Sequence, residues 1–129
     1  MDDVPIVLVT EDDELIQGIL VDALTEAGFE AIVASSGENA VELLDASHSK
    51  YRALVTDINL GRGKMDGWEV ARRAREIDQA FPVVYVSGDS AEDWGSKGVP
   101  NSIMLAKPFA PAQLVTAVSQ LLNAGMPPT

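Results

Sequence analysis

Short runs of consecutive apolar residues alternate five times with amphipathic stretches along this chain. The runs lie at residues 5–10, 29–34, 52–57, 82–87 and 102–106. Consecutive apolar residues are typical of strands buried on both faces of a parallel sheet. The stretches between them carry apolar residues three and four positions apart, which predicts helices. The pattern therefore predicts a doubly wound α/β fold, with helices on both faces of a parallel sheet.

The first two predicted helices begin at residues that commonly cap helices. Asp13 is predicted to be the N-cap of a helix over residues 13–27, with Gly28 at its C-terminal end. Ser36 is predicted to cap a second helix that runs to about residue 46. The apolar face of the first helix, which we expect to point inward, consists of Leu15, Ile16, Ile19, Leu20, Ala23, Leu24 and Ala27.

The second half of the chain continues the pattern with one irregular segment. A third helix is predicted over residues 68–78. The glycine-rich stretch before the fifth strand leaves room for only a short fourth helix, near residues 91–96. Pro111 suits the first position of the last helix, which Gly125 and two following prolines are predicted to end.

Length and composition limit the possible functions. The chain of 129 residues favours a single domain, residues 1–129, with no output domain. The first residues are acidic, cysteine is absent, and no apolar run approaches the ~20 residues of a membrane span. We therefore expect a cytoplasmic protein without a membrane segment. The net charge of −11 repels phosphate backbones, so no nucleic-acid binding is expected.

Five polar residues lie directly after predicted strands: Glu11, Asp12, Asp57, Ser87 and Lys107. Open parallel sheets bind ligands beyond the carboxyl ends of their strands, near the point where strand order reverses. We therefore expect these side chains to share one pocket. Two carboxylates ~4 Å apart near a surface repel by roughly 4 kcal/mol. One lysine does not balance three carboxylates, so the pocket predicts a Mg²⁺ site.

The same residues favour phosphoryl transfer. A carboxylate such as Asp57 can attack phosphorus to form an aspartyl phosphate. Lys107 is a compact cation suited to a phosphoryl oxygen, and the Ser87 hydroxyl can donate to another. Such reactions depend mainly on positioning and on charge neutralisation.

These residues and their surrounding motifs resemble the receiver domain of two-component response regulators. The resemblance covers nearly the whole chain. It rests on Glu11-Asp12, on Asp57 with MDGWEV downstream, on Ser87 in VVYVSGDS, and on Lys107-Pro108-Phe109. It implies a flavodoxin-like fold, with a five-stranded parallel sheet in the order 2-1-3-4-5.

The resemblance also implies roles for individual residues. Asp57 would accept a phosphoryl group from a histidine kinase or a phosphotransfer protein. Asp12, Asp57 and the backbone carbonyl of Asn59 would bind Mg²⁺ directly, while Glu11 would act through water.

Signalling is expected to follow from the same site. Ser87 and Lys107 would sense the phosphoryl group and alter the face formed by the fourth helix, the fifth strand and the fifth helix. A receiver without an output domain would bind a downstream protein, which the sequence does not identify, or would shuttle phosphate. It is not expected to be an enzyme, since it would catalyse only its own phosphorylation and dephosphorylation.

Three features depart from the family's usual pattern. The loop over residues 58–67 is longer than usual, with Gly61 where proline is common, and its Arg62 and Lys64 could help to select a partner. Met104 stands where the family usually has a switch aromatic. The fourth helix is expected to be short. The longer loop would also change the place of Asn59. The phosphorylation chemistry is expected to survive all three departures, whereas the output mechanism is expected to differ.

Other functions are weighed against this one. An aspartate-nucleophile phosphatase would share Asp57, but Asn59 stands where it needs a second carboxylate. A flavin-type nucleotide binder needs Ser, Thr and Gly after the first strand, where this chain has acids. A pseudo-receiver that only binds proteins would not need Asp12, Asp57 and Lys107. Taken singly, the acids could serve only a helix N-terminus, and Ser87 only a turn.

His48, the only histidine, is predicted to lie in a solvated loop, which argues against a phosphohistidine on this chain. Trp68, Trp94 and Met65 are predicted to be packing residues.

Overall fold

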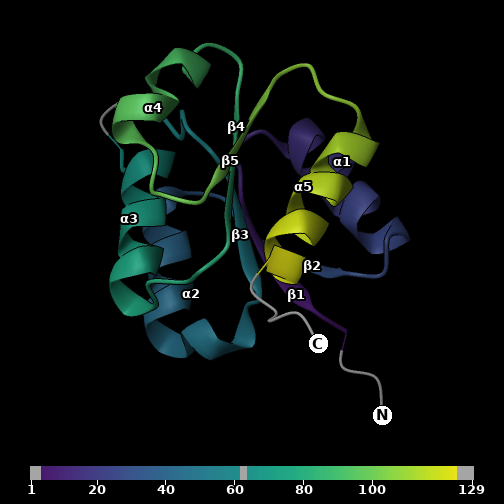
Figure 1. Ribbon diagram of the computed structural model, residues 1–129, viewed down its shortest axis with the longest axis horizontal. Coiled ribbons are helices and arrows are strands. Elements are labelled where there is room, and N and C mark those ends of the chain that lie inside the picture. Colours follow the sequence, from purple (N-terminus) through teal and green to yellow (C-terminus); the bar gives the residue numbers. More distant parts are fainter. Residues whose placement is uncertain (1–3, 62–63, 125–129) are drawn as a thin grey trace.

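A twisted parallel sheet forms the centre of the computed structural model, which describes residues 4–61 and 64–124 (Figure 1). The strand order is β2-β1-β3-β4-β5, as predicted. The strands are β1 (Ile6–Thr10), β2 (Glu30–Ala34), β3 (Ala53–Asp57), β4 (Val83–Ser87) and β5 (Ile103–Ala106). The α-helices are α1 (Glu14–Glu26), α2 (Gly37–Ser47), α3 (Gly67–Ile77), α4 (Trp94–Lys97) and α5 (Pro111–Ala124). Two short 3₁₀ helices, η1 (His48–Lys50) and η2 (Ala91–Asp93), complete the described part.

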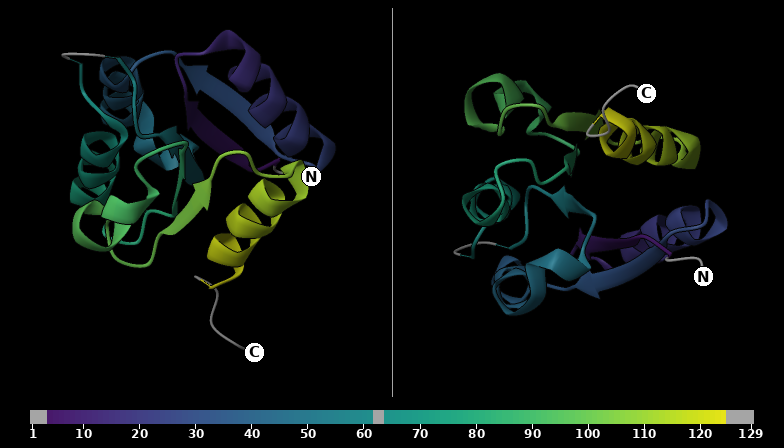
Figure 2. Two further views of the ribbon diagram at one scale, coloured as in Figure 1. Left: turned by 90° about the horizontal axis from the view of Figure 1, so that it is seen from above. Right: turned by 60° about the horizontal axis from the view of Figure 1, so that its bottom comes forward.

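The helices form a layer on each face of the sheet. Helices α1 and α5 lie together on one face, and α2 and α3 lie together on the other, with α4 beyond α3 (Figures 1 and 2). Every residue of β3 and of β4 is buried. Alternate residues of these strands therefore belong to two apolar clusters, one under each helical layer. The doubly wound fold and the short fourth helix are confirmed.

The helix ends follow local hydrogen bonding. Asp13 caps α1, since its carboxylate accepts the N–H groups of Leu15 and Ile16 at 2.9 and 3.3 Å. The Ser36 hydroxyl caps α2 by accepting the N–H of Asn39. Gly28 follows α1 with a φ of +95°, a conformation that glycine adopts without strain. The predicted end of α5 at Gly125 lies outside the described residues.

Helix α3 begins one residue earlier than predicted, because Asp66 forms a capping box with Glu69. The Asp66 carboxylate accepts the Glu69 N–H at 3.0 Å, and the Glu69 carboxylate accepts the Asp66 N–H at 3.3 Å.

The predicted inward face of α1 is partly wrong. Leu20, Ala23 and Leu24 are buried, whereas the side chains of Leu15 and Ile19 are 75% and 46% exposed. Ala27, the C-cap residue of α1, is also exposed. The sheet and α5 cover only the part of the helix centred on Leu20 and Leu24, so an apolar stripe is left facing solvent.

The packing predictions are correct for Trp68 and Met65 and wrong for Trp94. Trp68 is buried, and its ring lies 4.8 Å from that of Tyr85, tilted by 55°. Met65 packs, partly buried, against the same cluster. Trp94 is 39% exposed and lies on the surface rather than in the core. His48 is exposed, in η1 rather than in an irregular loop.

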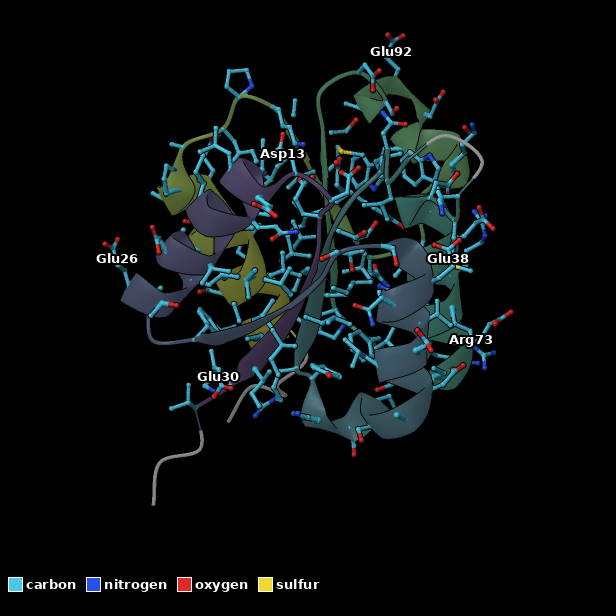
Figure 3. All side chains as sticks on the ribbon, turned by 180° about the vertical axis from the view of Figure 1, so that it is seen from behind. Asp13, Glu26, Glu30, Glu38, Arg73 and Glu92 are labelled. Atoms are coloured by element: carbon cyan, nitrogen blue, oxygen red, sulfur yellow. The ribbon has the colours of Figure 1, made fainter. Side chains whose placement is uncertain are left out.

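Acidic side chains spread over much of the surface. Glu26, Glu30 and Glu92 are exposed and point away from the fold, and Glu38 is exposed at the start of α2 (Figure 3). Arg73 of α3 pairs with Asp45 and Glu76, with N–O distances of 2.9 and 3.2 Å. Such exposed pairs contribute little to stability, about 0–1 kcal/mol each.

Candidate functional site

The parallel sheet brings residues from four strand ends to one edge. Asp57 ends β3, Ser87 ends β4, and Glu11 and Lys107 directly follow β1 and β5. In the sheet Asp57 pairs with Val86, and Ser87 pairs with Ala106, so the strands end nearly level. The backbone N–H of Lys107 donates to the Ser87 carbonyl at 2.7 Å. The predicted residues therefore meet at the carboxyl edge of the sheet, between the two helical layers.

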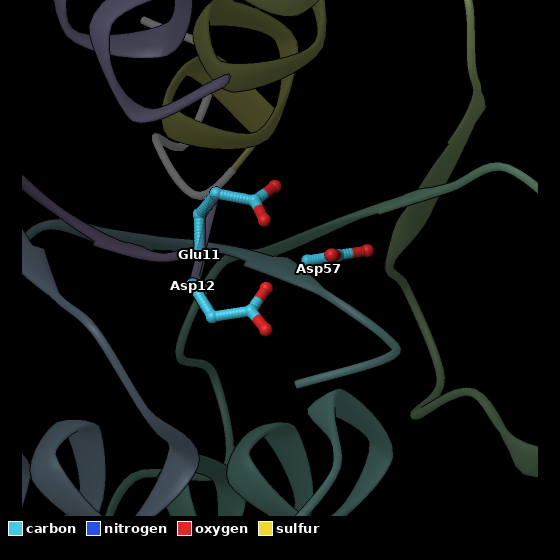
Figure 4. Close-up of side chains that lie close together, drawn as sticks. All are labelled: Glu11, Asp12 and Asp57. Carbon is cyan, nitrogen blue, oxygen red and sulfur yellow. The ribbon is translucent and has the colours of Figure 1, made fainter. Parts of the chain in front are cut away.

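Three carboxylates converge at this edge. Glu11, Asp12 and Asp57 each present an oxygen within 4.8 Å of the others, and their side chains point toward one another (Figure 4). Glu11 and Asp57 are buried, whereas Asp12 is exposed. Hard oxygen donors open to solvent on one side suit Mg²⁺, which keeps part of its water shell. The donor set therefore fits the predicted ion.

Lys107 lies against two of these carboxylates. Its ammonium nitrogen is 3.4 Å from an oxygen of Glu11 and 3.5 Å from an oxygen of Asp57. Lys107 also lines an apolar hollow of about 320 Å³, together with Ile16, Ile19, Pro108 and Phe109. One ammonium faces three acidic groups, so the pocket keeps a negative excess.

The pKa values reflect that excess. Burial, followed by the neighbouring charge of Asp57, raises the pKa of Glu11 to about 7, although the Asp13 N–H and Lys107 act in the opposite direction. Burial also raises the pKa of Asp57, against the lowering effect of Lys107. Both carboxyl groups therefore resist ionisation until more positive charge is present.

Glycine at the start of α3 allows the helix to approach the backbone of Asp57. A Cβ on Gly67 would lie 2.1 Å from the carbonyl oxygen of Asp57. The Gly67 N–H donates to the Ile58 carbonyl at 2.8 Å, and the Ile58 N–H donates to the Asp57 carboxylate at 2.8 Å. Gly67 was given no role from the sequence, although a glycine directly before a helix is a signal of close backbone approach.

Ser87 acts as an acceptor in this structure. Its hydroxyl oxygen accepts the N–H groups of Asp89 and Ser90 at 3.3 and 2.7 Å. The side-chain amide of Asn59 donates to the Asp89 carboxylate at 2.8 Å. Asp89 thus joins the loop after β3 to the segment after β4. No sequence signal pointed to Asp89, since SGDS has the composition of an ordinary turn.

Met65, which lies shortly before α3, contacts the start of α2. The Met65 N–H donates to the Glu38 carboxylate at 3.0 Å, and a Cβ on Gly37 would lie 2.7 Å from the Met65 carbonyl. Lys64 is exposed. The prediction for Arg62 lies outside the described residues.

Comparison with known proteins identifies the family. The model of the response regulator receiver domain matches residues 7–119. The chain belongs to the response regulator receiver domain family. This receiver domain is 33% identical to the response regulator receiver protein CpdR of Brucella abortus, over 92% of this chain and 97% of that protein. It is 31% identical to the transcriptional regulatory protein CusR of Escherichia coli, over 92% of this chain but only 51% of CusR.

Solved structures agree with this assignment. A response regulator receiver protein from Sinorhizobium medicae superimposes with a TM-score of 0.90 at 47% identity, over 95% of this chain and 97% of the other. The chemotaxis protein CheY4 of Vibrio cholerae, at 21% identity, shares the fold with a TM-score of 0.81, over 92% and 99% of the two chains.

Family membership places the receiver domain in two-component phosphorelay signalling. Receiver domains interact with histidine kinases and downstream effectors, and they bind Mg²⁺ in an acidic pocket like the one formed by Glu11, Asp12 and Asp57. Within residues 4–61 and 64–124, no helix is long and apolar enough to cross a bilayer.

Proposed function

We propose that this receiver domain accepts one phosphoryl group on Asp57 from a histidine kinase or a phosphotransfer protein, and signals by binding another protein or by passing the phosphate on. The observation that carries the proposal is the place of the Asp57 carboxylate at the open edge of the sheet, beside two other acids and 3.5 Å from the Lys107 ammonium. A buried nucleophile between a metal-binding acid set and a cation has what phosphoryl transfer requires.

The reaction begins at the free oxygen of Asp57. The Ile58 N–H holds one carboxylate oxygen, which orients the side chain. A carboxylate oxygen attacks the phosphorus of the donor's phosphohistidine, the P–N bond breaks, and the departing imidazole keeps the electron pair and takes a proton. Water later attacks the phosphorus, the P–O bond to Asp57 breaks, and inorganic phosphate leaves while the carboxylate is restored. The chain therefore acts on its own side chain, and we do not class it as an enzyme that turns over a separate substrate.

Neighbouring residues would stabilise the phosphoryl group. Asp12, Asp57 and the backbone carbonyl of Asn59 would hold Mg²⁺, with Glu11 acting through water, and the ion would neutralise charge on the phosphoryl oxygens. Lys107 is close enough to Asp57 to bind one phosphoryl oxygen. The Ser87 hydroxyl would donate to another after leaving the N–H groups of Asp89 and Ser90.

Intact-mass measurement after treatment with acetyl phosphate and Mg²⁺ tests the proposal. We expect the wild-type protein to gain one phosphoryl group and Asp57→Asn to gain none. Asp13→Asn is the matched control, since it removes an exposed carboxylate from the same acidic run while asparagine caps a helix as well as aspartate. Labelling of Asp57→Asn at the wild-type level would reject Asp57 as the acceptor.

A further inference from the structure

Two side chains of β4 hold the two ends of one short segment. Residues 91–97, which comprise η2 and α4, lie between the β4–η2 connection and the α4–β5 connection. At the first connection, the Ser87 hydroxyl accepts the N–H groups of Asp89 and Ser90. At the second, the Tyr85 hydroxyl accepts the N–H of Val99 at 3.1 Å. Ser87 and Tyr85 are two residues apart on a strand, so their side chains lie on the same face of the sheet.

The attachment at Tyr85 continues to the surface. The Ser102 hydroxyl donates to the Val99 carbonyl at 2.6 Å and accepts the indole N–H of Trp94 at 2.9 Å. The indole also packs on the backbone of Gly98, where a Cβ would lie 2.3 Å from a ring carbon. An unbroken series of hydrogen bonds therefore leads from the middle of β4 to Trp94, which is 39% exposed.

The two attachments differ in how firmly they are fixed. Tyr85 is fully buried, and its ring packs against Trp68, so its position is set by the core. Ser87 lies at the end of β4, which pairs with β3 at the phosphoacceptor, and its hydroxyl is bonded only to two backbone N–H groups of the following loop. Met104, which pairs with Tyr85 across the sheet, has a flexible thioether side chain that cannot form an equivalent hydrogen bond to Val99.

We propose that residues 91–97 form a clasp with a releasable end at Ser87 and a fixed end at Tyr85, and that phosphorylation of Asp57 moves Trp94 about the fixed end. The inference rests on the proposed function, because the Ser87 hydroxyl leaves the N–H groups of Asp89 and Ser90 only when a phosphoryl group draws it away. Tyr85 is then the positioning residue that determines where Trp94 lies after phosphorylation, on the face formed by α4, β5 and α5.

Fluorine NMR of the full chain labelled with 5-fluorotryptophan tests the clasp. Spectra are recorded with Mg²⁺ alone and with Mg²⁺ and beryllofluoride, which stands in for the phosphoryl group. The chain has two tryptophans, and Trp94→Phe assigns their resonances. In the wild type we expect both to shift, because Trp68 follows Gly67 against the Asp57 backbone and Trp94 lies in the clasp.

Substitutions at the fixed end test whether Tyr85 determines the movement of Trp94. In Tyr85→Phe we expect the Trp68 resonance to shift with beryllofluoride as in the wild type. The Trp94 resonance should no longer reach the position that it takes in the wild type with beryllofluoride. Ser102→Ala breaks the same series near the surface and should give the same result without altering β4. Arg75→Gln is the matched control, since Arg75 holds the same connection from α3 through the carbonyls of Pro100 and Asn101. Its Trp94 should move as in the wild type.

The result separates the clasp from the proposed function and from a general loss of stability. A purely structural role of Tyr85 would lower the melting temperature and leave the movement of Trp94 intact, which would overturn the inference. A Trp94 resonance that stays in place in the wild type while Trp68 shifts would also overturn it. If neither resonance shifts and acetyl phosphate adds no mass, the proposed function fails and the clasp fails with it.

Discussion

At the scale of single residues, the carboxyl group of Glu11 lies buried beside Asp57. Only 1% of the residue is exposed, yet its carboxylate accepts one backbone N–H, from Asp13 at 3.2 Å, and the more distant ammonium of Lys107. These contacts do not offset the loss of hydration, so ionising Glu11 costs folding free energy. The acidic pocket therefore lowers the stability of the fold when no cation is bound.

The pKa of Glu11 predicts a pH dependence of stability in metal-free protein. The pKa rises from 4.5 in the unfolded chain to about 7 in the fold. Between these values the folded state binds more protons than the unfolded state, so stability falls as the pH rises and levels off above about pH 7. The full loss is at most about 3 kcal/mol. Urea unfolding in EDTA at a series of pH values measures it.

Glu11→Gln should flatten most of that slope, because the amide does not ionise. Glu26→Gln, on the exposed side of α1, is the control and should keep the wild-type slope. Equal slopes in Glu11→Gln and the wild type would show that another group causes the pH dependence.

At the scale of elements, the contact between β3 and α3 depends on the missing side chain of Gly67. We expect Gly67→Ala to destabilise the protein by about 1–3 kcal/mol, because the Cβ has no room beside the Asp57 carbonyl. Phosphorylation should slow as well, since the backbone of the acceptor must move. Urea unfolding and the rate of acetyl phosphate labelling measure the two effects.

Gly18→Ala is the matched comparison within α1. A Cβ there meets nothing within 4 Å, so the change should stabilise the helix by roughly 0.5–1 kcal/mol. The two substitutions are chemically identical, and effects of the same sign would contradict the packing argument for Gly67.

The elements also show which features could be predicted from the sequence. The apolar runs predicted every strand to within one residue, and each observed strand begins one residue later than its run. The prolines that open two of the runs contribute only a carbonyl, since Pro5 accepts from Glu30 and Pro82 accepts from Leu54, whereas Arg52 donates its N–H to the Ile6 carbonyl. The exposure of Leu15 and Ile19 could not be predicted, since periodicity locates a helix face but not how much of it the neighbours cover.

Some features of the site could likewise be predicted from the sequence, and others could not. The meeting of Asp57 and Lys107, which lie 50 residues apart in the chain, follows from strand order and from the rule for parallel sheets. The acceptor role of Ser87 and the bond between Asn59 and Asp89 depend on the geometry of two loops. Loop composition predicts a turn, but not which of its polar groups will pair.

At the scale of the whole molecule, the net charge of −11 makes cation binding a source of stability. An ion that binds only the folded state stabilises it by about 2.7 kcal/mol at a hundred times its dissociation constant. We expect MgCl₂ to raise the melting temperature well above the effect of NaCl at equal ionic strength. Differential scanning calorimetry measures the difference, and EDTA should reverse it.

Asp12→Asn should lose most of this specific increase, because it removes an exposed ligand of the acidic pocket. Asp45→Asn, which removes an exposed carboxylate on α2, should keep it. If both variants respond to MgCl₂ like the wild type, general screening rather than the pocket explains the stabilisation.

The place of Lys107 has a consequence for how the chain is made. Translation releases β1 and β3, with all three acids, well before it releases the edge strand β5 and the lysine that follows it. A nascent chain that has paired its central strands therefore holds the acidic cluster without the Lys107 ammonium until β5 docks. Lys107 thus reaches the site after all three acids and offsets part of their charge, and a product that stops short of β5 would retain the acids without their ammonium partner.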